Sequence, residues 1–227
     1  MIAPGAAAPR AVFFDLDGTL ADTAADLAAP VNAMRAERGM EPLALEVLRP
    51  FASMGARGLI GRALGVAKEQ PEFEPLRLDF LARYERQMCL HTRLFDGMHE
   101  VIDALDASAI RWGVVSNKFE RYVRPIVERL GLGTRSATAV GGDTTAYAKP
   151  HPEPLLHAAR LVGADPAHCI YVGDDLRDVQ AGRAAGMRTV AAAYGYCGDA
   201  TPPHAWGADA TIASPIELIE LLGLRRR

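Results

Sequence analysis

A chain of 227 residues with 49% hydrophobic and 23% charged residues has the composition of an ordinary globular protein, which argues against a disordered or a membrane protein. Its 25 basic and 28 acidic residues give a net charge of −3, so charge alone favours neither nucleic acid nor an anionic membrane as a partner. No segment approaches the roughly 18 apolar residues that span a bilayer. Residues 1–10 lack a signal-peptide pattern, and we expect them to form a short leader on a cytoplasmic protein.

From Gly97 onward, apolar segments typical of buried strands alternate with helical patterns, which predicts a parallel sheet covered by helices. Apolar residues recur at helical spacing over 98–105 and 122–130. We therefore expect an α/β protein with a Rossmann-like core. Its strands are expected at residues 11–14, 112–115, 138–140, 169–172 and 189–192.

About a hundred residues separate the first two expected strands, which is too long for a simple crossover. This segment is helical in pattern, with Leu27, Val31 and Met34 on one helix. A longer helix presents an apolar face formed by Phe73, Leu76, Phe80, Leu81, Tyr84 and Met88. The glycine-rich segment 55–65 is expected to form a loop and a short, mobile helix. A helical domain at residues 22–94 is thus predicted to interrupt a core made of residues 1–21 and 95–227.

Polar side chains follow four of the expected strands. Because the carboxyl ends of parallel strands meet at one edge of a sheet, these side chains should converge on one crevice. So many carboxylates repel each other unless cations neutralise them. Lys149 and a hard divalent metal ion together would supply the positive charge that is needed. Magnesium fits best, since it commonly takes one or two carboxylates together with a substrate phosphate. The polar residues are Asp15, Asp17, Ser116, Asn117, Lys118, Lys149, Asp174, Asp175 and Asp178.

The motif DLDGT, residues 15–19, suits phosphoryl transfer. With one oxygen of Asp15 on the metal, the other is free to attack phosphorus and form an aspartyl-phosphate. Asp17 can then protonate the departing alkoxide and later deprotonate the attacking water. Gly18 permits the turn, and Thr19 offers a hydroxyl toward the crevice. Ser116 and the backbone N–H groups at the start of the next helix suit phosphate oxygens.

Each of these motifs has a purely structural alternative. A pair of aspartates after a strand is often a turn, and SNK or KP is most often a helix cap or a loop. Asp175 can be the N-cap of a helix whose first turn contains Asp178. The combination of all four motifs, in order and each at a strand end, favours a phosphoryl-transfer site.

The four motifs DLDGT, SNK, AKP and GDDLRD together resemble those of the haloacid dehalogenase superfamily of phosphohydrolases. The resemblance covers nearly the whole chain, because the helical insert is similar to the family's cap domain. It implies Asp15 as nucleophile, Asp17 as general acid and base, and Ser116 and Lys149 as holders of phosphate and nucleophile. It further implies a magnesium ion bound by Asp15, Asp174 and the main-chain carbonyl of Asp17. Substrate contacts are then expected from Thr19, Asn117 and Lys118, with Asp178 in support and the role of Asp175 open.

Within the superfamily, the chain resembles the phosphoglycolate phosphatase group, and most of all the N-acetylmuramic acid 6-phosphate phosphatases of cell-wall recycling. The segments that carry this resemblance include LFDGM, GVVSNK, VGDDLRD and HAWGAD. The expected substrate is therefore a small phosphorylated metabolite, N-acetylmuramic acid 6-phosphate, with 2-phosphoglycolate as the alternative. Both carry a carboxylate, so a cap cation is expected. Arg57 is the candidate, its alternative being a solvent-facing arginine at a helix start.

Four other functions compete with a phosphatase. A dehalogenase lacks the second aspartate of the first motif, so Asp17 argues against it. A sugar phosphomutase keeps all four motifs and differs in its cap. A receiver domain also gathers aspartates and a lysine around magnesium, but it has no large helical insert. A non-catalytic phosphate-binding module is disfavoured because no motif residue is missing. The sequence gives no indication of the oligomeric state.

Overall fold

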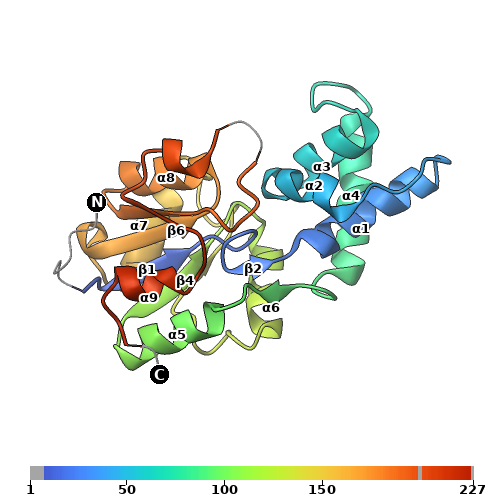
Figure 1. Cartoon of the computed structure of the whole chain (residues 1–227). Helices are drawn as coiled ribbons and strands as arrows, with labels where there is room; N and C mark the ends of the chain where they lie inside the picture. Colours follow the sequence, from blue (N-terminus) through green and yellow to red (C-terminus); the bar gives the residue numbers. More distant parts are fainter. Residues whose placement is uncertain (1–7, 199–200, 226–227) are drawn as a thin grey trace.

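A six-stranded parallel sheet forms the centre of the computed structural model, which describes residues 8–198 and 201–225 (Figure 1). The strand order is β5-β4-β1-β6-β7-β8, and every neighbouring pair is parallel. This confirms the predicted α/β class, although most of the expected N-terminal leader lies outside the described residues. The strands are β1 (Ala11–Phe14), β4 (Arg111–Val115), β5 (Ala139–Val140), β6 (Cys169–Gly173), β7 (Arg188–Ala192) and β8 (Ala210–Ile212).

Strand β1 lies in the middle of the sheet and is completely buried, because helices cover both faces. Val12 and Phe14 pack into the apolar cluster that includes α5 (Met98–Ala107), α6 (Glu120–Arg129) and α9 (Glu217–Leu221). Phe13, which points to the opposite face, packs against α7 (Glu153–Leu161) and α8 (Leu176–Ala184). An uninterrupted apolar strand is therefore what this central position requires. Strand β8 was not predicted, since three residues give too short a pattern.

The segment at residues 22–94 forms four α-helices that lie together beside the sheet (Figure 1). The chain enters this group through β2 (Ala21–Asp22) and leaves it through β3 (Arg93–Leu94), and these two short strands pair antiparallel. The predicted apolar faces are buried, including Val31 and Phe80. The division into domains at residues 22 and 94 stays a prediction. The helices are α1 (Ala24–Ala36), α2 (Leu45–Leu48), α3 (Gly55–Leu64) and α4 (Phe73–Gln87), with a 3₁₀ helix, η1 (Arg49–Met54), before α3.

The prediction of a loop in the glycine-rich segment 55–65 is wrong, because α3 is a regular ten-residue helix that fills nearly all of it. Two of its glycines mark the helix ends, where Gly55 and Gly65 have φ values of 58° and 70°. Gly58 allows close packing on η1, since a Cβ atom there would lie 2.7 Å from the carbonyl oxygen of Phe51. Two of these glycines thus mark the ends of α3 and a third allows its contact with η1, and none of them interrupts the helix.

The structure also shows the state of the cysteines and the character of the helices. The three cysteines, Cys89, Cys169 and Cys197, are free thiols, and Cys169 is buried. Among the helices of the described residues, none combines the length and the apolar character of a membrane span. Two further 3₁₀ helices, η2 (Pro166–His168) and η3 (Pro203–Ala205), connect elements of the sheet region.

Asp26 ties the start of α1 to the segment that returns to the sheet. Its carboxylate is 2% exposed and accepts hydrogen bonds from the backbone N–H groups of His91 (3.0 Å) and Thr92 (2.8 Å). The hydroxyl of Thr92 donates a further hydrogen bond of 2.6 Å. One buried carboxylate thereby satisfies three donors from a segment 65 positions further along the chain. Hydrogen bonds to a charged acceptor contribute more to stability than those between neutral groups.

We predict that Asp26→Ala lowers the free energy of unfolding by about 2–4 kcal/mol, because it removes three hydrogen bonds to a buried, charged acceptor. Urea denaturation followed by circular dichroism measures the change. Thr92→Val should lose part of the same free energy, and Asp103→Ala, which alters an exposed surface carboxylate, serves as the control. A midpoint for Asp26→Ala equal to that of the control would show that the contact does not stabilise the fold.

Candidate active site

The loop after β1 places Asp15 and Asp17 at the carboxyl edge of the sheet. The turn is closed by hydrogen bonds from Gly18 N–H to the carbonyl of Ala21 and from Leu20 N–H to that of Asp15. Gly18 has a φ of 86°, and a Cβ atom there would lie 2.2 Å from Oδ2 of Asp174. Only glycine therefore lets this loop approach the next motif so closely.

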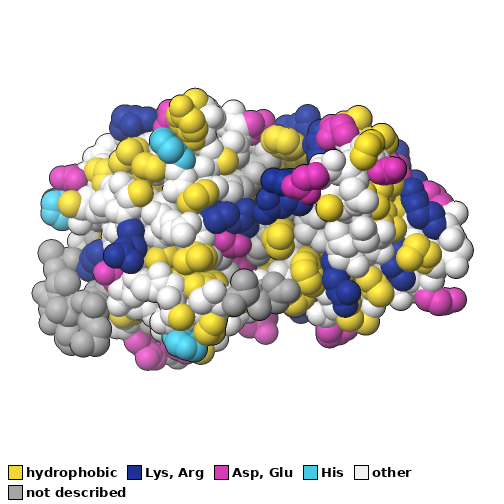
Figure 2. Space-filling model, turned by 90° about the horizontal axis from the view of Figure 1, so that it is seen from above, with side chains coloured by type: hydrophobic (Ala, Val, Ile, Leu, Met, Phe, Trp, Pro, Cys, Tyr) yellow, Lys and Arg dark blue, Asp and Glu magenta, His cyan; other side chains and the backbone are white. Residues whose placement is uncertain are grey.

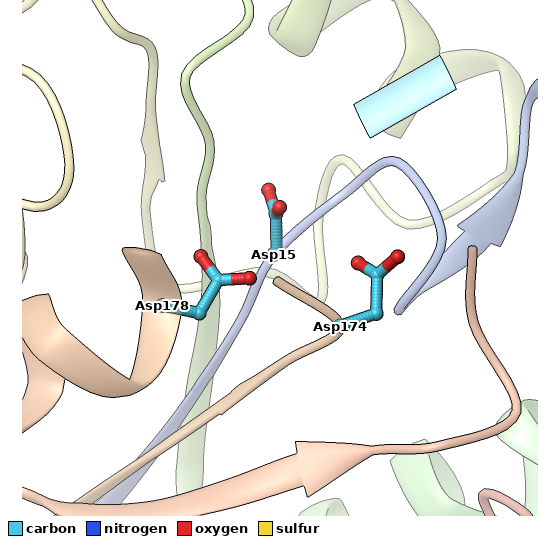
Figure 3. A group of neighbouring side chains, drawn as sticks. All are labelled: Asp15, Asp174 and Asp178. Atoms are coloured by element: carbon cyan, nitrogen blue, oxygen red, sulfur yellow. The ribbon is translucent and has the colours of Figure 1, made fainter. Parts of the chain in front are cut away.

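Three carboxylates from two strand ends and one helix converge at this edge, and their side chains face a common space (Figure 3). Asp15 follows β1, Asp174 follows β6, and Asp178 lies in the first turn of α8. All three are buried, and each offers an oxygen within 4.8 Å of the others. The sequence prediction that these aspartates meet is consistent with this geometry.

Lys149 lies among these carboxylates. Its Nζ is 2.7 Å from Oδ1 of Asp178 and 3.1 Å from Oδ1 of Asp15, and it also donates to the hydroxyl of Tyr171 at 2.7 Å. Burial alone would lower the pKa of Lys149, but the charges of Asp15 and Asp178 more than offset it and hold that pKa above its usual value. The ammonium is therefore charged and fixed beside Asp15.

The carboxylate cluster lacks positive charge. Three aspartates face one lysine, and burial, followed by the charges of Asp15 and Asp178, raises the pKa of Asp174 well above its usual value. A divalent cation would remove this imbalance, and carboxylate oxygens are the ligands that magnesium prefers. Asp178 is less available, because the ammonium of Lys149 lies 2.7 Å from its Oδ1, whereas the hydrogen-bond donors to Asp174 are neutral groups. The donor set therefore fits a magnesium ion at Asp15 and Asp174.

Thr19 and Asn117, two of the predicted site residues, hold members of this cluster in position. Thr19, expected to contact substrate, is fully buried and donates its hydroxyl to Oδ1 of Asp174 at 2.9 Å, so its side chain holds a carboxylate instead. Asn117 accepts from the backbone N–H of Lys149 and donates to its carbonyl, at 2.8 and 2.9 Å. The oxygen and the nitrogen of the Asn117 side chain thus both bind the backbone of Lys149. Ser116, at the end of β4, is buried and lies on the cavity described below.

Asp17 has its own set of partners. Its Oδ1 accepts a hydrogen bond of 2.5 Å from the hydroxyl of Thr23, and both of its oxygens lie 3.0 Å from Nζ of Lys118. The ammonium of Lys118 also lies 4.8 Å from the centre of the Tyr84 ring. Burial alone would lower the pKa of Lys118, but the charge of Asp17 more than offsets it, so that pKa lies above its usual value. Asp17 is thus paired separately from the carboxylate cluster.

Asp175 caps α8 and holds Arg177. Its side chain accepts from the backbone N–H of Arg177 at 2.9 Å and pairs with the guanidinium at 2.7 Å. Arg177 also donates to the carbonyl of Ser53 in η1 at 2.9 Å, and the hydroxyl of Ser53 lies 3.2 Å from Oδ2 of Asp174. The structural alternative for Asp175 as an N-cap is therefore correct. Sequence reasoning missed Arg177 and Ser53, because one arginine in a first helical turn looks like any solvated residue.

A cavity of about 330 Å³ lies between these loops and the helical segment. Figure 2 shows basic and acidic side chains where the two lobes of the molecule meet. Of the cations that line the cavity, Lys118, Lys149, Arg77 and Arg177 each pair with an acidic side chain. Arg57, on α3, is exposed and has no ion pair or hydrogen bond with any residue that the structure describes. Its charge is free to meet a ligand.

Comparisons with known proteins agree with this geometry. The haloacid dehalogenase-like hydrolase family model matches residues 12–192. The chain is 44% identical to an N-acetylmuramic acid 6-phosphate phosphatase of Pseudomonas putida, over 94% of this chain and 96% of that protein. It is also 44% identical to a phosphoglycolate phosphatase of Xanthomonas campestris pv. campestris, over 93% of this chain and 96% of that protein.

A solved structure, described as a predicted phosphoglycolate phosphatase from Haemophilus somnus, superposes with a TM-score of 0.82 at 26% identity. The superposition covers 96% of this chain and 99% of that one, so both the sheet and the helical segment are shared. The family model and the relatives together extend over all four motifs. The chain therefore belongs to the haloacid dehalogenase-like hydrolase family and is a phosphatase of that family.

Proposed function

We propose that the protein hydrolyses the phosphate monoester of a small acidic metabolite, with Asp15 as the nucleophile and magnesium as the cofactor. The observation that carries this proposal is the environment of Asp15. Its Oδ1 accepts from the backbone N–H of Leu16 at 2.7 Å and faces Lys149, whereas Oδ2 has no partner among the described residues. The side chain lines the cavity, so this oxygen can meet a phosphorus atom there.

The residues that would hold magnesium are Asp15, Asp174 and the main-chain carbonyl of Asp17. The ion, when bound, supplies the positive charge that the carboxylates and the substrate phosphate require. Thr19 and the backbone N–H of Tyr196 orient Asp174, with donor–acceptor distances of 2.9 and 2.8 Å. Such outer contacts fix the direction in which a ligating carboxylate points.

The reaction proceeds in two steps, as is general for this family, which works through an aspartyl-phosphate intermediate. In the first step, the Oδ2 of Asp15 bonds to phosphorus while the ester P–O bond breaks, and the leaving oxygen takes a proton from Asp17. In the second step, Asp17 takes a proton from water as that water attacks phosphorus and releases Asp15. Lys149 and Ser116 lie on the cavity beside Asp15 and bind the phosphate oxygens.

The helical segment at residues 22–94 acts as a cap that selects the leaving group. We favour N-acetylmuramic acid 6-phosphate, which is the substrate named for the relative from Pseudomonas putida. A cavity of about 330 Å³ is much larger than a two-carbon acid requires, and Phe80, Leu81 and Tyr122 give it an apolar wall that suits a sugar ring. The named substrate of the Xanthomonas relative keeps 2-phosphoglycolate as the second candidate.

Arg57 is our candidate for the carboxylate that both substrates carry. It lines the cavity from α3, and its guanidinium has no acidic partner among the described residues. An arginine can bind a carboxylate through two parallel hydrogen bonds, which gives a direction as well as a charge. The contact would fix the end of the substrate that is remote from the phosphate.

Removal of divalent metal should abolish turnover, because the carboxylate cluster then repels the phosphate. Treatment with EDTA followed by gel filtration should reduce hydrolysis of p-nitrophenyl phosphate to background, and added magnesium should restore it. Addition of sodium chloride at matched ionic strength is the control. Undiminished hydrolysis in metal-free buffer would contradict the proposed site.

Substitution of the two aspartates of the first motif should separate their roles. Asp15→Asn removes the nucleophile, so both turnover and the acid-stable phosphoenzyme should be lost. Asp17→Asn should lower turnover roughly 10²- to 10⁴-fold, the usual contribution of a proton donor, yet still accept phosphate from an activated ester. Rapid quenching with labelled substrate measures both quantities. A labelled phosphoenzyme in Asp15→Asn would refute the assignment of the nucleophile.

Arg57→Ala should lower kcat/KM for N-acetylmuramic acid 6-phosphate by about 10- to 100-fold, the usual effect of a charged hydrogen bond. It should have little effect on N-acetylglucosamine 6-phosphate, which lacks the carboxylate. Arg62→Ala is the matched control, since Arg62 lies on the same helix and stacks on Phe51. Equal kinetics of Arg57→Ala and Arg62→Ala would exclude this anchor. A strong preference of the wild-type protein for 2-phosphoglycolate would reverse the choice of substrate.

A further inference from the structure

The two lysines of the active site serve different carboxylates. Lys149 contacts Asp15 and Asp178, whereas the ion pair of Lys118 within the described residues is with Asp17 alone. The side chain of Lys118 is 8% exposed, and its Nζ is 3.0 Å from each oxygen of Asp17. A cation held symmetrically against a carboxylate restricts the rotation of that carboxylate. Lys118 is therefore arranged around the proton donor and not around the nucleophile.

The helical segment completes the surroundings of Lys118. Its ammonium lies 4.8 Å from the centre of the Tyr84 ring, which belongs to α4. That ring is itself fixed, because it stacks on Phe80 and meets Tyr122 edge to face, with ring centres 6.4 and 5.5 Å apart. The aromatic face attracts the ammonium and holds it in place against Asp17.

We propose that Lys118 is the positioning residue for Asp17 in the first step of the reaction. The inference rests on the proposed function, in which Asp17 gives its proton to the leaving oxygen. As the ester P–O bond breaks, its electron pair stays on the leaving oxygen, which takes the proton, and the bond between Asp15 and phosphorus forms. Asp17 gains a negative charge at that moment. Lys118 orients the carboxyl group and compensates this charge in the transition state.

This role predicts a dependence on the leaving group. An alcohol is a poor leaving group and needs its proton early, whereas p-nitrophenolate leaves without one. The contribution of Lys118 should therefore be large for an alkyl ester and small for p-nitrophenyl phosphate. A lysine that only bound the phosphate would instead affect both esters equally, because the phosphate is the same.

The experiment compares benzyl phosphate with p-nitrophenyl phosphate, two esters of similar size. The measured quantity is kcat/KM, which covers only the steps up to the departure of the leaving group. Lys118→Met should lower kcat/KM for benzyl phosphate at least about 30-fold more than for p-nitrophenyl phosphate. This factor is smaller than the roughly 10²- to 10⁴-fold contribution of a proton donor, because Lys118 acts only through Asp17. Lys118→Arg should restore much of the loss. Lys68→Met, at an exposed lysine of the helical segment, is the matched control.

A double-substitution cycle tests whether Lys118 acts through Asp17. In the Asp17→Asn background, Lys118→Met should no longer change the ratio of kcat/KM between the two esters. Tyr84→Leu removes the ring and should shift the ratio in the same direction as Lys118→Met, whereas Tyr84→Phe keeps the ring and should retain the wild-type ratio. The Tyr84 variants carry the test if Lys118→Met does not fold, as judged by circular dichroism and thermal melting.

An equal loss for both esters, or an unchanged ratio in Lys118→Met, would overturn the inference. The same holds if Lys118→Met still changes the ratio in the Asp17→Asn background, or if Tyr84→Leu slows both esters equally. Failure of the proposed function would look different. In that case the wild-type protein would hydrolyse neither ester, or Asp15→Asn would hydrolyse both.

Discussion

The crowding of buried carboxylates at one edge of the sheet is the constraint on which the rest of the structure depends. Asp15, Asp174 and Asp178 each offer an oxygen within 4.8 Å of the others, and Lys149 pairs with Asp15 and Asp178. Such an arrangement costs stability in the absence of a further cation, and ion pairs and hydrogen bonds to each of the three carboxylates hold it in place. Gly18 permits the close approach, and Asn117 fixes the loop that carries the lysine. In the proposed function, a magnesium ion would balance this charge.

Much of this arrangement was predictable from the sequence, because two general rules of parallel sheets determine where the polar residues lie. A buried central strand must be apolar, and ligands of a parallel sheet gather at its carboxyl edge. The position of Asp15 after β1 and of Asp174 after β6 follows from these two rules. The strand order does not follow from them, nor does the short strand β8.

The contacts between the sheet region and the helical segment were not predictable, since they join residues far apart in the chain. Arg177 reaches the carbonyl of Ser53, 124 positions away, and Lys118 meets the ring of Tyr84. Each of these residues looks ordinary by itself, as a solvated arginine or a core tyrosine. The glycines of segment 55–65 led to the wrong prediction of a loop, because glycine occurs where elements pack closely, as α3 does on η1, as well as in flexible segments. Local patterns identify the elements, and only the fold identifies their partners.

The pairing of β2 with β3 has a consequence for the history of such enzymes. Ala21 lies opposite Leu94 and Asp22 opposite Arg93, so the chain leaves the sheet region and returns to it at neighbouring points. A segment with adjacent ends can be lengthened, shortened or exchanged during evolution without moving any strand of the sheet. The loops of the proposed active site can then stay unchanged while the helical segment, which faces the proposed leaving group, varies. Two relatives, each 44% identical to this chain, carry the names of different substrates.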